Sequence, residues 1–244
     1  MAIKVAIIGL GIMGRRMLSH MRRHNNFEPD YLWDPNQSAC QRAKLLDSKS
    51  YIMDSASDAI SKADLVYLAC PPAVREPYAL EAAAAGKALF LEKPFGVNID
   101  DSARMMGRLK SFDVPVAVNF TQASGIALTD LLAAKKRGDM GDLLGVDIVV
   151  TYPDWPRLWQ RDADWLRFRA EGGMTREVIS HFLFFSERVL GPLSLLSAHT
   201  TYPEDLSLCE TAVLARLVSE KKQEVSILAT VGGVQPDRQE LTVK

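Results

Sequence analysis

The glycine-rich turn near the start of this chain constrains its fold more than any other segment. Residues 3–8 form a nearly continuous apolar run of strand length, residues 9–14 read Gly-Leu-Gly-Ile-Met-Gly, and residues 15–21 have helical spacing. A buried strand, a glycine turn and a helix, in that order, are the context in which G-x-G-x-x-G binds the pyrophosphate of a dinucleotide. The alternative is a strand-to-helix turn that holds no ligand.

The positions of this turn have separate expected roles. Gly9 permits the tight turn, Gly11 lets a pyrophosphate approach the backbone, and Gly14 lets the helix pack closely on the strand. Ile12 and Met13 complete the turn, and the helix N-terminus offers free N–H groups and a partial positive charge to the phosphates. We therefore expect these five residues to contact the cofactor.

A carboxylate follows at the end of the second expected strand. Asp34 lies twenty positions after Gly14, where an acid accepts hydrogen bonds from the adenosine ribose. It also suits the cap of a helix expected over residues 37–46, and the two roles are compatible. An acid here repels a 2′-phosphate and no arginine follows directly, so the sequence favours NAD over NADP.

Strands and helices alternate as far as residue 120, the pattern of an α/β Rossmann domain with a doubly wound parallel sheet. The later strands are expected at residues 30–33, 51–53, 64–69, 87–91 and 115–118. In such a sheet the ligand crevice lies at the carboxyl ends of the strands. Two strand ends carry the candidate residues Cys70, Pro71, Pro72, Glu92 and Lys93, which we expect beside the cofactor.

The pattern changes after residue 120. Helices are expected over residues 123–137 and 174–190, and strands over 143–151, 193–202, 211–219, 224–231 and 239–243. Successive strands joined by short turns imply a mainly antiparallel sheet. The sequence thus predicts a Rossmann domain at residues 1–120 and an α+β substrate and oligomerisation domain at residues 121–244.

The strands of this second domain also suggest self-association. One face of the sheet is expected to lie under the 174–190 helix. Strand residues such as Leu195, Val213, Leu217 and Ile227 are too apolar for both faces of the sheet to be exposed to water, so the other face needs a partner. We therefore expect a homodimer or homotetramer that forms through this sheet.

Glu177 and His181 stand four residues apart on the expected helix and so share a face. Histidine is the side chain best suited to exchange a proton near neutral pH, and a carboxylate one turn away orients it or raises its pKa. The alternative is an ordinary pair on a helix surface. No third ligand of the right kind is nearby in sequence, so we expect no metal site.

The composition narrows the choice of partners and compartment. The net charge of −1 indicates neither nucleic acid nor a membrane surface as a partner. No apolar run approaches the roughly 20 residues needed to span a bilayer. The first strand leaves no room for a signal peptide, and Cys40, Cys70 and Cys209 are spaced like reduced thiols. We expect a cytoplasmic protein.

Several motifs in this order resemble the Gfo/Idh/MocA oxidoreductases, the glucose–fructose oxidoreductase and inositol dehydrogenase family. The motifs are the glycine turn at 9–14, Pro-Pro at 71–72, Ala-Gly-Lys at 85–87, Glu-Lys-Pro at 92–94, Met-Gly-Asp-Leu-Leu at 140–144 and Gly-Gly-x(3)-Glu-x(2)-Ser-His at 172–181. The resemblance covers nearly the whole chain.

The resemblance implies hydride transfer between a nicotinamide and a hydroxyl-bearing carbon of a sugar, cyclitol or related small polar molecule. By the same resemblance, Lys93 binds and polarises the reacting oxygen, and His181 donates or accepts the proton. Glu177 takes the place of the usual aspartate of that helix. The expected activity is that of an NAD-dependent dehydrogenase or reductase.

The chain departs from the family pattern at several positions. Arg75 stands where the family commonly has histidine, Asn119 lacks a nearby arginine, and Phe184 replaces a second acid. The second domain also looks shortened relative to the family. Two alternatives therefore stay open: a non-catalytic dinucleotide-binding sensor or regulator, and a reductase of an unsaturated or aromatic substrate. Trp155, Trp159 and Trp165 would either stack on such a substrate or pack within the fold.

Overall fold

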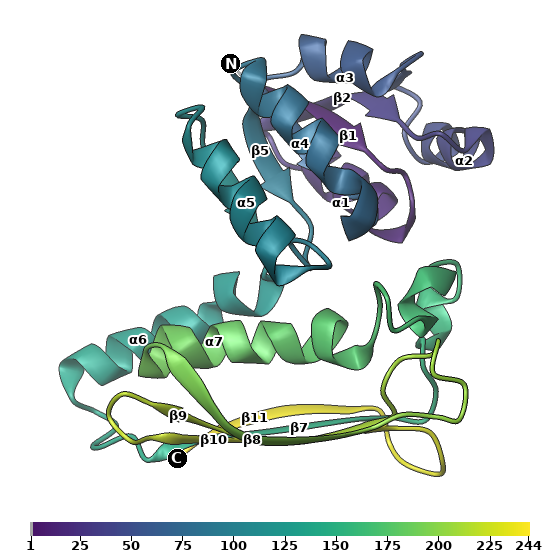
Figure 1. Cartoon of the computed structure of the whole chain (residues 1–244). Helices are drawn as coiled ribbons and strands as arrows, with labels where there is room; N and C mark the ends of the chain where they lie inside the picture. The colour runs from purple at the N-terminus through teal and green to yellow at the C-terminus, as the bar shows by residue number, and fades with distance from the viewer. Residues whose placement is uncertain (1) are drawn as a thin grey trace. The chain divides into compact units, whose positions relative to one another are not determined.

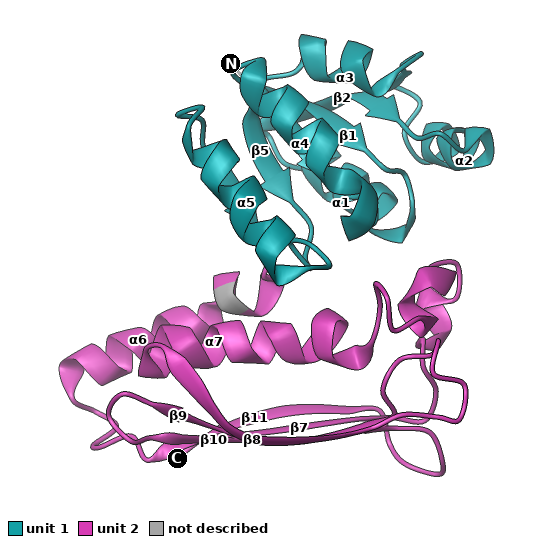
Figure 2. Ribbon diagram, in the orientation of Figure 1, with its two compact units in different colours: residues 1–119 teal, residues 120–244 magenta. Residues whose placement is uncertain are grey.

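The computed structural model describes residues 2–244, the side chain of Ala123 excepted, and divides the chain into two compact units. Unit 1 comprises residues 1–119 and unit 2 residues 120–244, as the two colours of Figure 2 show. Within the described residues, no helix combines the length and the apolar character that crossing a membrane requires.

Unit 1 is built on a six-stranded, wholly parallel sheet with the order β3-β2-β1-β4-β5-β6 (Figure 1). Its strands are β1 (Ile3–Ile8), β2 (Phe27–Trp33), β3 (Tyr51–Ile52), β4 (Leu65–Leu68), β5 (Ala88–Leu91) and β6 (Val116–Val118). Its helices are α1 (Ile12–Arg22), α2 (Gln37–Leu46), α3 (Ala56–Lys62), α4 (Arg75–Ala84) and α5 (Ile99–Lys110). The strand order reverses at β1, so ligands are expected at the carboxyl ends of the strands there.

The apolar alternation of β1 explains why helices cover both faces of this sheet. Ile7 packs in a cluster with Leu18 of α1, whereas Ala6 and Ile8 pack in a second cluster with the alanines of α3 and α4. Successive strand residues point to opposite faces, and all of these β1 side chains are fully buried. The predicted doubly wound α/β fold is confirmed.

Two details of unit 1 differ from the sequence-based expectation. The second strand begins at Phe27, three residues earlier than expected, because it pairs with β1 from the Ile3–Phe27 position onward. The cap of α2 is Asn36, whose side chain accepts the backbone N–H of Ser38 at 2.9 Å. The capping role considered for Asp34 therefore belongs to Asn36.

Unit 2 contains a five-stranded sheet with the order β11-β7-β10-β9-β8 and two long helices on one of its faces (Figure 1). The elements are α6 (Ile126–Arg137), β7 (Gly145–Tyr152), α7 (Ser180–Leu190), β8 (Leu193–Thr201), β9 (Ala212–Ser219), β10 (Glu224–Val231) and β11 (Arg238–Val243). The prediction of a mainly antiparallel sheet is confirmed. The sheet has one parallel pair, in which β7, lying between β10 and β11, runs parallel to β10.

The apolar strand residues singled out in the sequence lie on the face of the unit 2 sheet that the helices cover. Val213 and Ile227 are buried in the core with α7, and Leu217 packs against it. Leu195 is the cross-strand neighbour of Leu217, so it shares that covered face at the sheet edge. All four residues therefore share the face that the helices cover, so a partner on the open face would contact other side chains.

The open face carries its own apolar row. Leu214, Leu228 and Val149 are successive cross-strand neighbours on β9, β10 and β7, and cross-strand neighbours point to the same side of a sheet. Leu214 is 53% exposed and Leu228 is 45% exposed. The open face therefore presents large apolar side chains of its own.

Candidate active site

The fold requires two of the three glycines in the glycine turn and does not require the third. Gly9 has a φ of +95°, and a Cβ there would lie 2.6 Å from the backbone N of Cys70. A Cβ on Gly14 would lie 1.9 Å from the carbonyl oxygen of Gly9. A Cβ on Gly11 would meet no described atom within 4 Å. Close packing accounts for Gly9 and Gly14, whereas Gly11 borders open space where a pyrophosphate could approach.

Asp34 fastens the glycine turn to the end of β2. Its Oδ2 accepts the backbone N–H of Leu10 at 2.7 Å, and its Oδ1 accepts that of Asn36 at 2.8 Å. The carbonyl of Leu10 in turn accepts from Nη1 of Arg15 at 2.7 Å. A carboxylate oxygen has a second lone pair, so Asp34 can still accept a ribose hydroxyl. The sequence analysis missed Arg15, whose position one turn into α1 was its only signal.

A buried arginine joins the two strand ends that carry the other candidate residues. Arg75, at the start of α4, is 1% exposed. Its Nη2 donates to the carbonyl of Cys70 at 2.8 Å, and its Nη1 donates to the carbonyls of Glu92 and Pro94. Burial lowers the pKa of this guanidinium. The backbone on both sides of Lys93 is thereby held against the turn that follows β4.

The carboxylate of Glu92 points inward, not toward solvent. It is 4% exposed and accepts from the Tyr67 hydroxyl and from Nδ2 of Asn119, the latter at 2.7 Å. Burial, and then the nearby Glu92 charge, raises the pKa of Tyr67, so the phenol remains a donor. These bonds tie together the ends of β4, β5 and β6. Sequence patterns place these residues at strand ends but do not reveal that they meet.

The proton-exchange candidates of unit 2 lie at a helix start with unusual geometry. The helix expected over residues 174–190 is present, with a π-helical turn, Thr175–Ile179, near its start and α7 after it. Glu177 lies in this turn and His181 in the first turn of α7, and each is 7% exposed. They are thus buried polar residues, which argues against an ordinary surface pair. Single π turns are frequent at functional sites.

Glu210 and the glycine pair explain how this helix begins. Oε1 of Glu210 accepts the backbone N–H of Thr175 at 2.7 Å. Gly173 has a φ of +103°, and a Cβ there would lie 2.6 Å from Oε2 of Glu210. A Cβ on Gly172 would lie 2.3 Å from the carbonyl oxygen of Leu166. The glycines therefore serve close packing, and Glu210, which no sequence motif indicated, caps the helix.

An aromatic wall borders the histidine. The His181 ring meets Phe120 edge to face, with centroids 5.6 Å apart and planes at 84°. Phe120 stacks on Phe184 at 4.5 Å and 15°. Phe184, which stands where the family has an acid, is thus a packing partner of Phe120. This side of the histidine is apolar.

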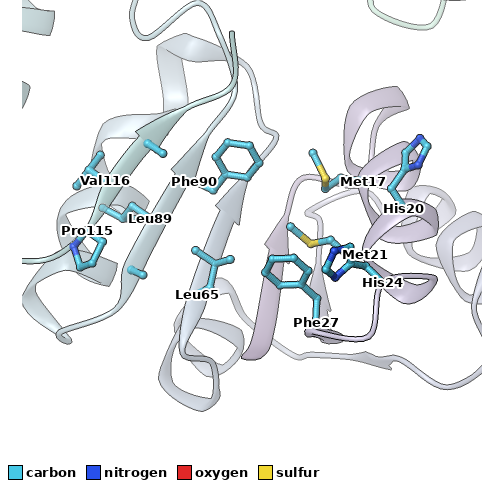
Figure 3. A pocket seen from close by; sticks show the side chains of 12 residues that line it. Met17, His20, Met21, His24, Phe27, Leu65, Leu89, Phe90, Pro115 and Val116 are labelled. Atoms are coloured by element: carbon cyan, nitrogen blue, oxygen red, sulfur yellow. The ribbon is translucent and has the colours of Figure 1, made fainter. Parts of the chain in front are cut away.

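An apolar cavity of about 460 Å³ in unit 1 is separate from the glycine turn (Figure 3). Side chains of α1, including Met17 and Met21, line one side, and Leu65, Phe90 and Val116 line the other. Leu65 and Val116 lie in the amino-terminal halves of β4 and β6. Phe90 lies on the face of β5 that packs toward α1. The cavity offers few polar groups to a dinucleotide, so we do not assign the cofactor to it. Within the described residues, no group of three His, Cys, Asp or Glu residues could hold a metal ion.

Part of the chain matches known proteins in sequence. Residues 3–120 match the model of an oxidoreductase family with an NAD-binding Rossmann fold. The chain is 28% identical over 130 residues to dTDP-3,4-didehydro-2,6-dideoxy-alpha-D-glucose 3-reductase of Streptomyces violaceoruber, an alignment covering 52% of this chain and 36% of that protein. The chain thus aligns with only about a third of the length of this curated relative.

Two solved structures share the fold of the chain. The WlbA dehydrogenase from Bordetella pertussis, in complex with NADH and UDP-GlcNAcA, matches with a TM-score of 0.87 and 23% identity, covering 100% of this chain and 77% of that one. A myo-inositol dehydrogenase from Corynebacterium glutamicum matches with a TM-score of 0.85 and 15% identity, covering 100% and 72%.

The glycine turn, the carboxylate that ends β2 and the family match together define an NAD-binding Rossmann protein of the oxidoreductase class. The matching model is that of the Gfo/Idh/MocA family, so residues 3–120 resemble the NAD-binding Rossmann domain of this family. The resemblance inferred from the sequence motifs and the expectation of NAD as cofactor are confirmed.

The opening at Gly11 leads to a prediction about cofactor affinity. Replacing Gly11 by alanine should raise the Kd for NADH by about ten-fold or more, because the new methyl would occupy the path of the pyrophosphate. The φ of Gly11 is −64° and its Cβ would touch no described atom, so thermal unfolding should not change. NADH titration by fluorescence and a melting curve measure the two effects.

Gly14→Ala is the matched control for this prediction. Its methyl would overlap the Gly9 carbonyl, so this variant should lose stability as well as affinity. If Gly11→Ala bound NADH as tightly as the wild type, the turn would not be the pyrophosphate site.

Proposed function

We propose that the protein is an NAD-dependent oxidoreductase that interconverts a hydroxyl and a carbonyl on a small polar molecule of the sugar or cyclitol type. The observation that carries the proposal is that an open glycine turn after β1 and a lysine in a buried framework after β5 both follow the carboxyl ends of strands of one parallel sheet. When bound, NAD supplies the hydride acceptor or NADH the hydride donor. The residues that would hold it are the glycine turn, Asp34, the Cys70–Pro72 turn and Glu92–Lys93.

The side chains of the chain supply charge and proton transfer. The ammonium of Lys93 would bind the reacting oxygen and stabilise the negative charge that develops on it. The imidazole of His181 would take the hydroxyl proton during oxidation and return it during reduction, and Glu177 would orient the ring. Binding by Arg75 to the carbonyls of Glu92 and Pro94 would keep Lys93 in place. The named relatives, a sugar reductase and an inositol dehydrogenase, act on substrates of this kind.

The test is a panel of polyols, inositols, free sugars and nucleotide-linked sugars, scored by the absorbance change of NAD⁺ or NADH. On a substrate that turns over, Lys93→Met should lower kcat by about 10²–10³-fold, the effect typical of losing one such charge-stabilising donor. Lys110→Met, an exposed lysine of α5, is the control and should retain activity. Full activity in Lys93→Met would contradict the assignment.

A non-catalytic sensor of the dinucleotide is the second candidate. Phe184 favours it, because an aromatic stack with Phe120 occupies a position where the family has an acid. Tight NADH binding without turnover across the whole panel would support the sensor. Any substrate-dependent oxidation of NADH would reject it.

The charge of Asp34 leads to a prediction about cofactor choice. Asp34→Asn should shift the ratio of Kd values toward NADP by about ten-fold or more, because it removes a like charge that repels the 2′-phosphate. The amide oxygen can still accept the N–H of Leu10, which keeps the contact with the glycine turn, whereas the N–H of Asn36 loses its acceptor. Asp54→Asn, an exposed acid, should leave the ratio unchanged. Equal discrimination in Asp34→Asn and the wild type would reject this role.

We also propose a homodimer or homotetramer that associates through the open face of the unit 2 sheet. Large apolar side chains on an exposed sheet face are typical of an interface. Leu214→Arg should therefore convert the oligomer to a monomer in sedimentation velocity at micromolar concentration. Leu45→Arg, at a position of α2 that is 88% exposed, should not. A monomeric wild type would contradict the proposal.

A further inference from the structure

The arginine–aromatic contacts of this protein are concentrated in one part of unit 2. Four such contacts occur among the described residues, and all involve three arginines of the 157–169 segment. The pairs are Arg157 with Tyr152 and Trp159, Arg167 with Phe168, and Arg169 with Tyr202. Proteins average about one significant cation–π contact per 70–80 residues, so the number is ordinary for this length but the clustering is not.

Of these three arginines, Arg157 contacts two aromatic rings and the other two contact one each. Its Cζ lies 4.9 Å from the centroid of the Tyr152 ring and 4.8 Å from that of Trp159. Its Nε donates to Oε1 of Gln160 at 2.9 Å. Tyr152 is fully buried and Gln160 is 4% exposed, so the contacts have fixed supports. No hydrogen bond to the two Nη groups occurs among the described residues, which leaves the outer edge of a preorganised guanidinium for an anion.

Trp159 gives this arginine an aromatic neighbour that solvent can reach. The residue is 49% exposed although one contact is with Arg157. Trp155 differs, because its Nε1 donates to the carbonyl of Leu166 at 3.0 Å and its ring packs against the core. Packing thus accounts for Trp155, whereas Trp159 has an open surface on which a flat ring could stack.

The segment that holds Arg157 is joined to the start of the candidate catalytic helix. The carbonyl of Leu166 accepts both Nε1 of Trp155 and the backbone N–H of Gly173, each at 3.0 Å. Gly173 immediately precedes the π-helical turn that contains Glu177. A ligand bound at Arg157 would therefore rest on a segment that is fixed relative to this helix.

We propose that Arg157 and Trp159 anchor the nucleoside diphosphate part of a nucleotide-linked sugar. The base stacks on Trp159, and the Nη groups of Arg157 bind the diphosphate. A planar ring beside two phosphates matches an exposed indole beside a planar cation better than an uncharged cyclitol does. The inference rests on the proposed function and narrows its substrate class to sugars activated as nucleoside diphosphates. Two of the compared proteins bear names with such compounds, dTDP and UDP derivatives.

Calorimetric titration of the full chain with UDP and with dTDP, at saturating NADH, tests the anchor. NADH fills the cofactor site, so the probe cannot bind there. The wild type should bind one equivalent of UDP or dTDP. Arg157→Gln and Trp159→Ala should each raise the Kd by about ten-fold or more, and uridine or pyrophosphate alone should bind more weakly than UDP. Arg188→Gln, an exposed arginine of α7, should bind as the wild type does.

The outcomes separate the anchor from the proposed oxidoreductase activity. If neither UDP nor dTDP binds to the NADH-loaded wild type, or if both variants bind them with wild-type affinity, the anchor is overturned even where free polyols are oxidised. If UDP binds and the variants weaken it, the anchor holds even where no nucleotide-linked sugar is turned over, and the activity proposal fails alone. Circular dichroism of both variants verifies that they are folded.

Discussion

Replacing Arg75 by methionine should destabilise unit 1 by about 3–5 kcal/mol, the usual result of removing one partner from a buried charged group. Methionine has a similar length but makes no hydrogen bonds. The carbonyls of Cys70, Glu92 and Pro94 would lose their donor. The buried carboxylate of Glu92 would also lose the cation beside it. Unpaired buried groups carry their full desolvation penalty, which outweighs the relief of no longer burying a guanidinium.

Hydrogen exchange measures this loss separately in each unit. The amides of β4 and β5 should exchange faster in Arg75→Met, whereas those of β9 and β10 should not change, because they belong to the other unit. Arg75→Lys keeps the charge but has one nitrogen for three carbonyls. Its amides of β4 and β5 should therefore exchange at rates between those of the wild type and of Arg75→Met. Arg108→Met is the control, since its ion pair with Glu76 is exposed and such pairs contribute little. Wild-type protection in Arg75→Met would show that the arginine does not hold these strand ends.

Local patterns in the sequence predicted the parts of this site that lie close together in the chain. A glycine turn, the acid after β2 and the strand ends at Cys70 and Glu92 can be read directly, because each depends on a few neighbouring residues. Arg75 attracted notice only as a departure from the family. Its contacts with Glu92 and Pro94 span 17 and 19 positions, and no periodicity reports a contact of that range.

In unit 2, too, features that are local in the sequence were predicted and contacts between distant residues were not. Spacing correctly placed Glu177 and His181 near the start of one long helical segment. It did not indicate the carboxylate of Glu210, 35 positions after Thr175, which accepts the N–H of Thr175 at the start of the π-helical turn. The sheet was predicted, whereas its covered face was not. Alternation along the strands does not show that Val213 and Ile227 face α7, because only packing decides which of the two faces the helix covers.

Replacing His181 by alanine should lower kcat by about 10²–10⁴-fold on a substrate that turns over, the range typical of losing a general acid or base. The ring is 7% exposed and lies against Phe120, so its removal leaves a space with an apolar wall. Added imidazole should enter this space and restore part of the rate, which a purely structural role of the histidine would not allow. The Kd for NADH should not change, because the proposed cofactor residues belong to unit 1. His199→Ala, an exposed histidine of β8, is the matched control and should keep full activity. If His181→Ala retained the wild-type kcat, or if added imidazole did not raise its rate, another group would have to exchange the proton. His181 and Glu177 would then have only a structural role in the helix.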